Sequence, residues 1–214
     1  MKTAVSASLI TLALLAGCSP APADSPEAVA EIDTEMAAPE APATETALEA
    51  AIASDVRSPE EKARDVWRHP KETLEFLGVE PDDTVVEIWP GGGWYTNILA
   101  PWLASGGGQL VEVLFDPTGI EDAERVARIE TNNETFKSNY TDPKFGTISY
   151  SGFSANSGPL TDPDTADVVL TFRNIHNWMN GCYEQKFFDD AYAALKPGGV
   201  LGVVEHRLHS TAIQ

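Results

Sequence analysis

Two short stretches of the sequence bring together residues that can bind a ligand or move a proton. The first, VVEIWPGGGWYT (residues 85–96), places Glu87 shortly before three consecutive glycines. Such glycines permit positive φ and let a ligand approach the backbone without interference from a Cβ atom. A helix beginning after them would offer free N–H groups and a positive dipole end. Glu87 could accept hydrogen bonds from a cationic or hydroxylated ligand, so the stretch predicts a ligand-binding turn; a plain tight turn with an exposed strand-end charge is the alternative.

The second stretch, FRNIHNWM (residues 172–179), is too polar for a core and too aromatic for an ordinary loop. An imidazole is a common general base near neutral pH, so His176, with Asn174 beside it, is a candidate for taking a proton from a nucleophile. Both side chains could instead bond the neighbouring backbone and shape the loop. Arg173 could pair with a ligand carboxylate or with Glu87. His206 and His209 have no accompanying cluster of Cys, Asp or Glu, so no metal site is predicted.

The elements that would position these residues alternate between strands and helices. Apolar strand-like segments separated by helical patterns predict an α/β fold, a Rossmann-like doubly wound and mostly parallel sheet. Both stretches would then follow strands at the carboxyl edge, where open sheets of this kind bind ligands. Strands are expected at 84–89, 109–116, 146–153, 166–172 and 199–206, and helices from Ser58, over 71–77 before Gly78, over 92–104, around 119–139 and around 181–195.

The same stretches carry a family resemblance. VVEIWPGGGWYT is similar to motif I of class I S-adenosylmethionine-dependent methyltransferases, in which a strand ending in an acid precedes G-x-G-x-G. The segments 167–178 and 195–207 resemble the fourth- and fifth-strand regions of that family, and the resemblance covers roughly residues 60–207. More narrowly, W-P-G-G-G-W-Y with F-R-N-x-H-N-W resembles exported bacterial proteins described as predicted methyltransferases. The resemblance implies a fold of the class I methyltransferase type, S-adenosylmethionine as cofactor and a small-molecule methyl acceptor.

The resemblance also implies roles for single residues. Glu87 matches the motif acid, and Gly91 and Gly93 match the second and third glycines. Asp116, at the end of the second strand, matches the acid that binds the cofactor ribose, although Asp116–Pro117 could also be a plain turn. Trp89 stands where the family has its first glycine, which implies that the approach to the methionine end of the cofactor is changed or partly filled.

Two further cofactor contacts follow from the resemblance. The segment SGFSAN (residues 151–156) lacks the aspartate that often contacts the adenine, which leaves Ser154 or Asn156 as substitutes. Arg173 follows the fourth strand, at the edge where the cofactor or substrate would bind.

The N-terminus predicts export. Met1–Lys2 gives a basic start, and residues 4–16 form an apolar run too short to span a bilayer. LAGC (residues 15–18) resembles the bacterial lipobox, which implies a signal peptide over residues 1–17 and lipidation of Cys18. Ser19 after the cysteine implies the outer membrane. The protein is therefore expected to be a periplasm-facing lipoprotein of the bacterial envelope that contacts the membrane only through its lipid.

Charge and composition divide the rest of the chain. The net charge of −19 over 214 residues argues against nucleic acids and anionic headgroups as partners, so a small-molecule ligand is expected. Residues 18–55 are rich in Ala, Pro and Glu, which predicts a disordered tether whose last part is weakly helical. Residues 56–214 form the predicted methyltransferase-like domain. Because few residues follow the fifth strand, the domain is expected to be C-terminally incomplete.

Two functions of different classes fit these features. One is a methyltransferase that transfers a methyl group from S-adenosylmethionine to a small molecule. The other is a non-catalytic periplasmic lipoprotein that uses the same fold as a binding module, because fold alone does not decide activity. Export distinguishes the two, since S-adenosylmethionine is made in the cytoplasm.

Overall fold

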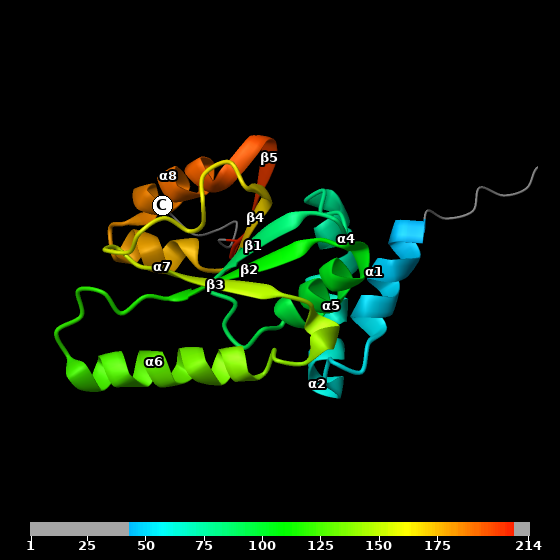
Figure 1. The fold of residues 1–214 in the computed structure, drawn as a ribbon, viewed down its shortest axis with the longest axis horizontal. Helices are drawn as coiled ribbons and strands as arrows, with labels where there is room; N and C mark the ends of the chain where they lie inside the picture. The colour runs from blue at the N-terminus through cyan, green and yellow to red at the C-terminus, as the bar shows by residue number, and fades with distance from the viewer. Residues whose placement is uncertain (1–42, 208–214) are drawn as a thin grey trace, which may run out of the picture. The chain divides into compact units, whose positions relative to one another are not determined.

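A computed structural model describes residues 43–207 of the chain (Figure 1). The predicted signal peptide, Cys18 and most of the predicted tether lie outside the described residues, as does His209. None of the described helices is both long and apolar enough to cross a membrane.

A five-stranded, fully parallel sheet forms the centre of the domain, in the order β3-β2-β1-β4-β5. The chain moves outward from β1 in one direction, returns, and moves outward again from β4. This arrangement confirms the predicted doubly wound, Rossmann-like fold and puts the switch in chain direction between β1 and β4. The strands are β1 (Thr84–Ile88), β2 (Gln109–Phe115), β3 (Ile148–Phe153), β4 (Ala166–Phe172) and β5 (Leu195–Val204).

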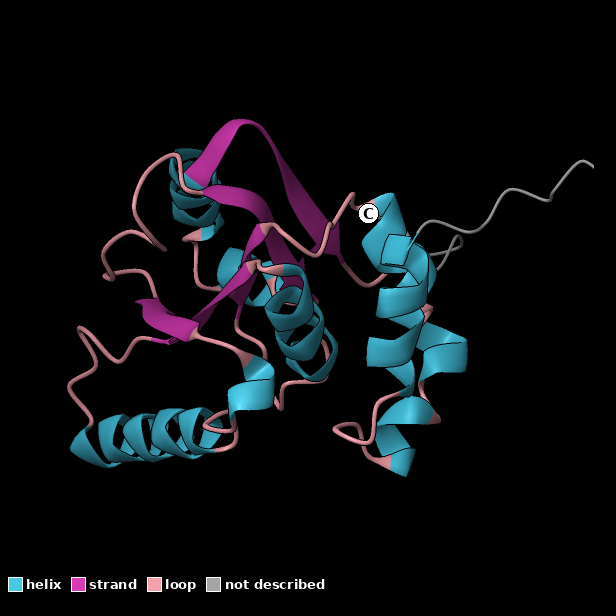
Figure 2. Ribbon diagram, turned by 45° about the vertical axis from the view of Figure 1, so that its right-hand side comes forward, coloured by secondary structure: helices cyan, strands magenta, loops and turns pink. Residues whose placement is uncertain are grey.

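Helices cover both faces of this sheet, as Figure 2 shows. One apolar core joins alternate strand residues to α1, α4 and α5, and a second joins the intervening strand residues to α7 and α8. Successive side chains along each strand therefore point into opposite cores. The helices are α1 (Ala43–Ala53), α2 (Pro59–Lys62), α3 (Asp65–Arg68), α4 (Pro70–Phe76), α5 (Thr96–Gly106), α6 (Ala123–Ser138), α7 (Ile175–Asn180) and α8 (Glu184–Ala194), with a 3₁₀ turn, η1 (Pro143–Phe145).

The folded domain begins earlier than composition predicted. Leu48 and Ala51 of α1 are buried in the first core, although the sequence assigned residues up to 55 to the tether. Arg57 fixes the following loop, because its guanidinium donates to the Ile52 carbonyl and to both carboxylate oxygens of Asp65. Composition did not reveal this helix, because its two buried apolar residues stand within an Ala/Glu-rich segment and the ion pair that holds it lies after that segment.

The predicted start of the second helix is confirmed in detail. Ser58 and Glu61 form a capping box, in which the Ser58 hydroxyl accepts from the Glu61 N–H and the Glu61 carboxylate accepts from the Ser58 N–H. The next predicted helix corresponds to α4 and is followed by Gly78 at φ 69°. The helix expected from Ser58 is interrupted at Ala63 and Arg64, and its second part is α3, which is followed by His69 in the left-handed region.

Three other boundaries differ from prediction. The helix expected over 92–104 begins only at Thr96, because residues 91–95 form the glycine turn. Residues 175–180 form a separate short helix, α7. The strand expected from residue 199 already begins at Leu195, directly after α8, since Leu195 pairs with Ala166 of β4.

Candidate functional site

A cleft of about 600 Å³ opens at the carboxyl ends of β1 and β4, where the direction of the sheet reverses. We call it the switch cleft; its walls are the turn after β1, the turn after β4 and the helices α2 and α3. Five of the predicted site residues line it: Glu87, Gly91, Arg173, Asn174 and His176. The position agrees with the general rule for ligand sites in open α/β sheets.

The glycines of the turn after β1 have different roles. Gly91 has φ 62°, and a Cβ atom placed on it would meet nothing within 4 Å. Neither its N–H nor that of Gly92 has a hydrogen-bond partner among residues 43–207, so both donors are available to a ligand. Gly93 at φ 81° is buried, and a Cβ atom there would overlap the phenol oxygen of Tyr140. Gly93 therefore serves packing, and its predicted cofactor contact stays a prediction.

Trp89 adopts the backbone conformation that its glycine counterpart would supply. Its φ is 51°, in the left-handed region, which costs a non-glycine residue about 1–2 kcal/mol. The indole stacks on Phe115 at 4.6 Å between ring centroids, and its Nε1–H donates to the Phe153 carbonyl at 3.1 Å. Phe115 and Phe153 end β2 and β3. The Trp89 ring therefore lies near the ends of β2 and β3, beside Asp116. The resemblance had implied that this side chain fills the part of the site for the methionine end of the cofactor.

Glu87 forms the floor of the cleft as part of a buried acidic pair. It lies beside Glu112 in the β1–β2 register, and the two are 1% and 0% exposed. Glu87 accepts a hydrogen bond from the Thr96 hydroxyl at 2.9 Å, whereas the carboxyl oxygens of Glu112 have no partner among the described residues. Burial raises the pKa of Glu87 to about 7, against the hydrogen bond from Thr96 that lowers it. Burial and the neighbouring Glu87 raise the pKa of Glu112 well above its usual range.

This pair corrects the sequence interpretation of Glu87. The residue is not an exposed strand-end charge, because it is 1% exposed, and its predicted contact with a cofactor stays a prediction. Two adjacent buried carboxyls cannot both be charged without a large cost, so they retain a proton between them near neutral pH. Glu112 was missed, although a charged residue within the otherwise apolar segment QLVEVLF was a visible signal.

The turn after β4 is anchored through Asn174. Its side-chain amide donates to the Ile88 carbonyl at 3.0 Å and to the Thr171 hydroxyl at 3.1 Å, which ties β4 to the end of β1. Of the two roles considered for Asn174, these contacts favour shaping the loop over catalysis. Arg173, at φ 62°, bonds the Val204 carbonyl through its N–H, and its exposed side chain forms no ion pair with Glu87.

His176 is held by a carboxylate that the sequence did not single out. Its Nδ1 lies 3.1 Å from Oε2 of Glu205, and Oε1 of Glu205 accepts from the Ile175 N–H at 2.7 Å. Burial would raise the pKa of Glu205, but hydrogen bonds from His176 and from the backbone of His206 and Ile175 outweigh it and lower that pKa. With Nδ1 facing the carboxylate, Nε2 is the nitrogen left to accept a proton. The signal for Glu205 was its place directly after the last strand, in VVEHR.

Asp116 and Ser154 lie together at the ends of β2 and β3, outside the switch cleft. Asp116 Oδ1 accepts from the Thr118 N–H at 2.8 Å, which is the plain turn considered as an alternative. The Ser154 hydroxyl likewise accepts from the Asn156 N–H at 3.2 Å, and the Asn156 amide donates to the Thr118 carbonyl. Both predicted cofactor residues are therefore at least partly engaged in their own loops.

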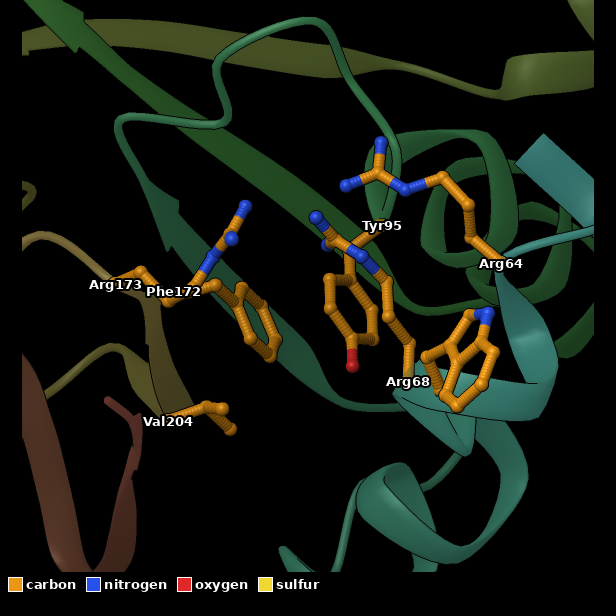
Figure 3. Close-up of a pocket in the computed structure, with 7 residues that line it drawn as sticks. Arg64, Arg68, Tyr95, Phe172, Arg173 and Val204 are labelled. Atoms are coloured by element: carbon orange, nitrogen blue, oxygen red, sulfur yellow. The ribbon is translucent and has the colours of Figure 1, made fainter. Parts of the chain in front are cut away.

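Arginines form a wall of the cleft that the sequence did not predict. Arg64 and Arg68 come from the two ends of α3 and lie with Arg173 around a compartment of about 300 Å³ (Figure 3). Burial, and then the charges of Arg64 and Arg173, lower the pKa of Arg68. Within residues 43–207, no group of three or more His, Cys, Asp or Glu side chains is placed to hold a metal ion.

Comparisons with known proteins give similar folds only. Neither a protein-family model nor a curated protein matches the chain. A candidate S-adenosyl-L-methionine-dependent methyltransferase from Methanococcus maripaludis has 18% identity and a TM-score of 0.42, over 73% of this chain and 62% of that one. Coclaurine N-methyltransferase bound to N-methylheliamine and SAH has 11% identity and a TM-score of 0.36, over 69% and 36%. Mitomycin 7-O-methyltransferase has 17% identity and a TM-score of 0.37, over 77% and 45%.

The chain thus spans about three fifths of the length of the methanococcal structure and less of the other two. At these identities and TM-scores the likeness carries no argument about activity. The fold assignment rests on the strand order and the parallel pairing of this chain.

Proposed function

We propose that the protein is an S-adenosylmethionine-dependent methyltransferase acting on a small molecule. One observation carries this proposal: the motif I turn and His176, whose ring is held by Glu205, belong to one cleft at the switch point of the sheet. Gly91 supplies an open left-handed turn there, and His176 lines the same cavity. A site for a nucleoside-like cofactor and a proton acceptor are thereby adjacent.

The residues present fit such a cofactor at the turn after β1. Gly91 lacks a Cβ where the cleft is open, and the N–H groups of Gly91 and Gly92 are unpaired donors. A neighbouring compartment of about 280 Å³, lined in part by Gly91, Phe115 and Asn133, would take its apolar part. When bound, S-adenosylmethionine supplies an electrophilic methyl group on a sulfonium. The N–H groups of the turn would orient it, and the aromatic walls would exclude water.

His176 would act on the methyl acceptor. With an Nδ1–H donated to Glu205, the ring would keep Nε2 as the base, and the carboxylate would stabilise the imidazolium formed when Nε2 takes a proton from the acceptor. Glu205 is in this proposal a positioning residue. Its second oxygen is fixed by the Ile175 N–H, so the carboxylate cannot rotate freely.

The test is isothermal calorimetry on the full-length protein with S-adenosylmethionine and S-adenosylhomocysteine. We expect both ligands to bind, and binding to weaken at least about tenfold, or about 1.4 kcal/mol, in Gly91→Ala, whose new methyl group would project into the cleft. Gly107→Ala is the matched control, because Gly107 also has positive φ and open space but caps the far end of α5. No heat from either ligand at millimolar concentration would remove the methyltransferase proposal and leave a binding module.

We also propose that the protein is a lipoprotein of the bacterial envelope, on the strength of the lipobox-like LAGC and the apolar N-terminal run. Labelling cells with a radioactive fatty acid should mark the wild-type protein and spare Cys18→Ser. Equal labelling of the two would contradict this localisation.

A further inference from the structure

The three arginines of the cleft wall come from separate parts of the chain. Arg64 and Arg68 are carried by α3, and Arg173 follows β4. In Figure 3 their guanidinium groups lie on one side of the compartment, above the rings of Tyr95 and Phe172 and beside the glycine turn. Chain segments about a hundred residues apart therefore deliver positive charge to one small space.

No carboxylate of the described residues neutralises these arginines. None of the three forms an ion pair within residues 43–207, although the chain has 33 acidic residues against 14 Lys and Arg. Arg57, only a few residues earlier, contrasts with them because Asp65 binds it through two oxygens. Like charges brought together without a counter-charge repel each other, and the charges of Arg64 and Arg173 add to burial, the larger cause, in lowering the pKa of Arg68. A bound anion would relieve that repulsion.

The rest of the compartment is apolar and flat. Tyr95 and Phe172 stack with ring centroids 3.7 Å apart and planes 10° from parallel. Val204 closes one side, and Trp67, 80% exposed, forms the rim. Aromatic surface with a few convergent charged groups suits a small molecule that has an apolar body and one charged end. Guanidinium groups bind carboxylate and phosphate in bidentate fashion, so the charged end of such a molecule should be negative, a carboxylate or a phosphate.

The compartment lies toward β4 and β5, whereas Gly91 and the second compartment lie toward β1 and β2. His176 belongs to the larger cleft that joins them. Building on the proposed methyltransferase function, we infer that the methyl acceptor is a small organic anion, a carboxylate or phosphate on an apolar body, held by Arg64, Arg68 and Arg173 over the Tyr95–Phe172 stack.

The experiment titrates the full-length protein with three probes of similar shape and different charge: benzoate, phenyl phosphate and the neutral benzamide. Binding is followed by ligand-observed NMR in low-salt buffer. We expect either anion, or both, to bind and benzamide to bind at least about tenfold more weakly, because a charge-assisted hydrogen bond is worth more than about 1.4 kcal/mol. The anion that binds more tightly identifies the headgroup.

Single variants test the site itself. Arg64→Gln and Arg68→Gln should each weaken anion binding by about tenfold. Arg128→Gln is the matched control, since Arg128 is an exposed arginine on α6, away from the cleft. Far-UV circular dichroism of every variant confirms that a loss of binding does not arise from unfolding.

The outcomes separate this inference from the proposed function. Anion binding lost in the α3 variants, with unchanged affinity for S-adenosylhomocysteine, supports an acceptor site. Equal binding of benzamide and benzoate, no binding of any probe, or unchanged binding in Arg68→Gln overturns it. A parallel loss of S-adenosylhomocysteine affinity in Arg68→Gln also overturns it, because the arginines would then hold the cofactor. If the wild-type protein binds benzoate but neither S-adenosylmethionine nor S-adenosylhomocysteine, the proposed function fails and the anion site stands.

Discussion

The turns after β1 and β4 begin with the same left-handed backbone conformation, but the side chain of the first residue is packed in one turn and exposed in the other. Each strand leaves the sheet through a non-glycine residue with positive φ, Trp89 at 51° and Arg173 at 62°. Trp89 is half-buried, stacked and hydrogen-bonded, and a buried acidic pair lies beneath its turn. Arg173 is exposed, its side chain is unpaired within the described residues, and His176 and Glu205 follow on the same side.

The two turns share a strained left-handed backbone conformation but differ in what that conformation achieves. After β1 the strain is offset by packing, so the turn is a rigid part of the scaffold. After β4 the turn is held by the Arg173 N–H on Val204 and by the Asn174 amide, while the Arg173 side chain itself is exposed at the cleft, so the strain there presents a charged side chain. Substitutions of the packed residues of the first turn, Trp89 and Gly93, should therefore change stability, and substitution of Arg173 in the second should change ligand binding with little loss of stability.

The largest effect is expected at Gly93. Gly93→Ala adds a methyl group that overlaps the Tyr140 hydroxyl and also retains φ 81°, so we expect a loss of about 3 kcal/mol or more in the free energy of unfolding. Gly91→Ala has the same type of backbone strain but open space, and should lose only about 1 kcal/mol. Urea denaturation followed by tryptophan fluorescence measures both. Similar losses in the two variants would contradict the packed description of this turn.

The next effect concerns pH and the acidic pair. Because the folded state raises the pKa of Glu87 from 4.5 to about 7, its contribution to stability is complete below the ordinary carboxyl range and is lost as pH rises through about 7. The loss between pH 5 and pH 8.5 should be on the order of 3 kcal/mol. Glu87→Gln removes the titrating group and should flatten this dependence, whereas the exposed Glu130→Gln should not. Parallel urea curves for both variants would contradict the assignment.

Opposite signs are expected for the two strained residues. Trp89→Gly relieves the backbone but removes the stacked indole, so stability should fall by about 2 kcal/mol. Arg173→Gly relieves a similar strain and removes no internal side-chain contact, so stability should rise by up to about 1 kcal/mol relative to Arg173→Ala. Thermal melts of the four proteins, including wild type, decide the point. A lower stability of Arg173→Gly than of Arg173→Ala would contradict the proposed difference between the two turns.

The smallest effect is expected at Glu205. Its pKa is lowered in the folded state, so its contribution is present above the ordinary carboxyl range and is lost as pH falls through the folded pKa. Glu205→Gln should cost no more than about 1 kcal/mol at neutral pH, since the pair with His176 is partly exposed. The difference from wild type should vanish in acid. Urea denaturation of both proteins at neutral and at acid pH measures this difference, and a difference that persists unchanged in acid would contradict the assignment.

The sequence predicted the sheet well because strand periodicity and capping are local properties. Ser58 with Glu61, Gly78 and the five apolar strands could each be recognised within a few residues. The cleft was predicted only in part. Gly91, Arg173 and His176 follow strands whose ends must meet, so their proximity followed from topology.

What could not be predicted depends on contacts between distant segments. Arg64 and Arg68 lie in a short helix whose place beside β4 is set by the Arg57–Asp65 ion pair and by packing on Trp94. Glu205 meets His176 only because β4 and β5 are neighbours. The orientation of the Trp89 indole depends on its contacts with Phe115 and Phe153, at the ends of β2 and β3. These residues are distant in sequence, so no local pattern predicts that orientation.

The buried Arg57 has a practical consequence for choosing where to cut the chain. This residue connects the carbonyl of Ile52, at the end of α1, to Asp65 in the helix that carries Arg64 and Arg68. A recombinant fragment trimmed to residue 56, where composition changes, would keep every strand and still lose Leu48, Ala51 and the Ile52 carbonyl. Such a fragment could fold its sheet and yet lack one wall of the cleft, so negative binding data from it would say nothing about the whole protein.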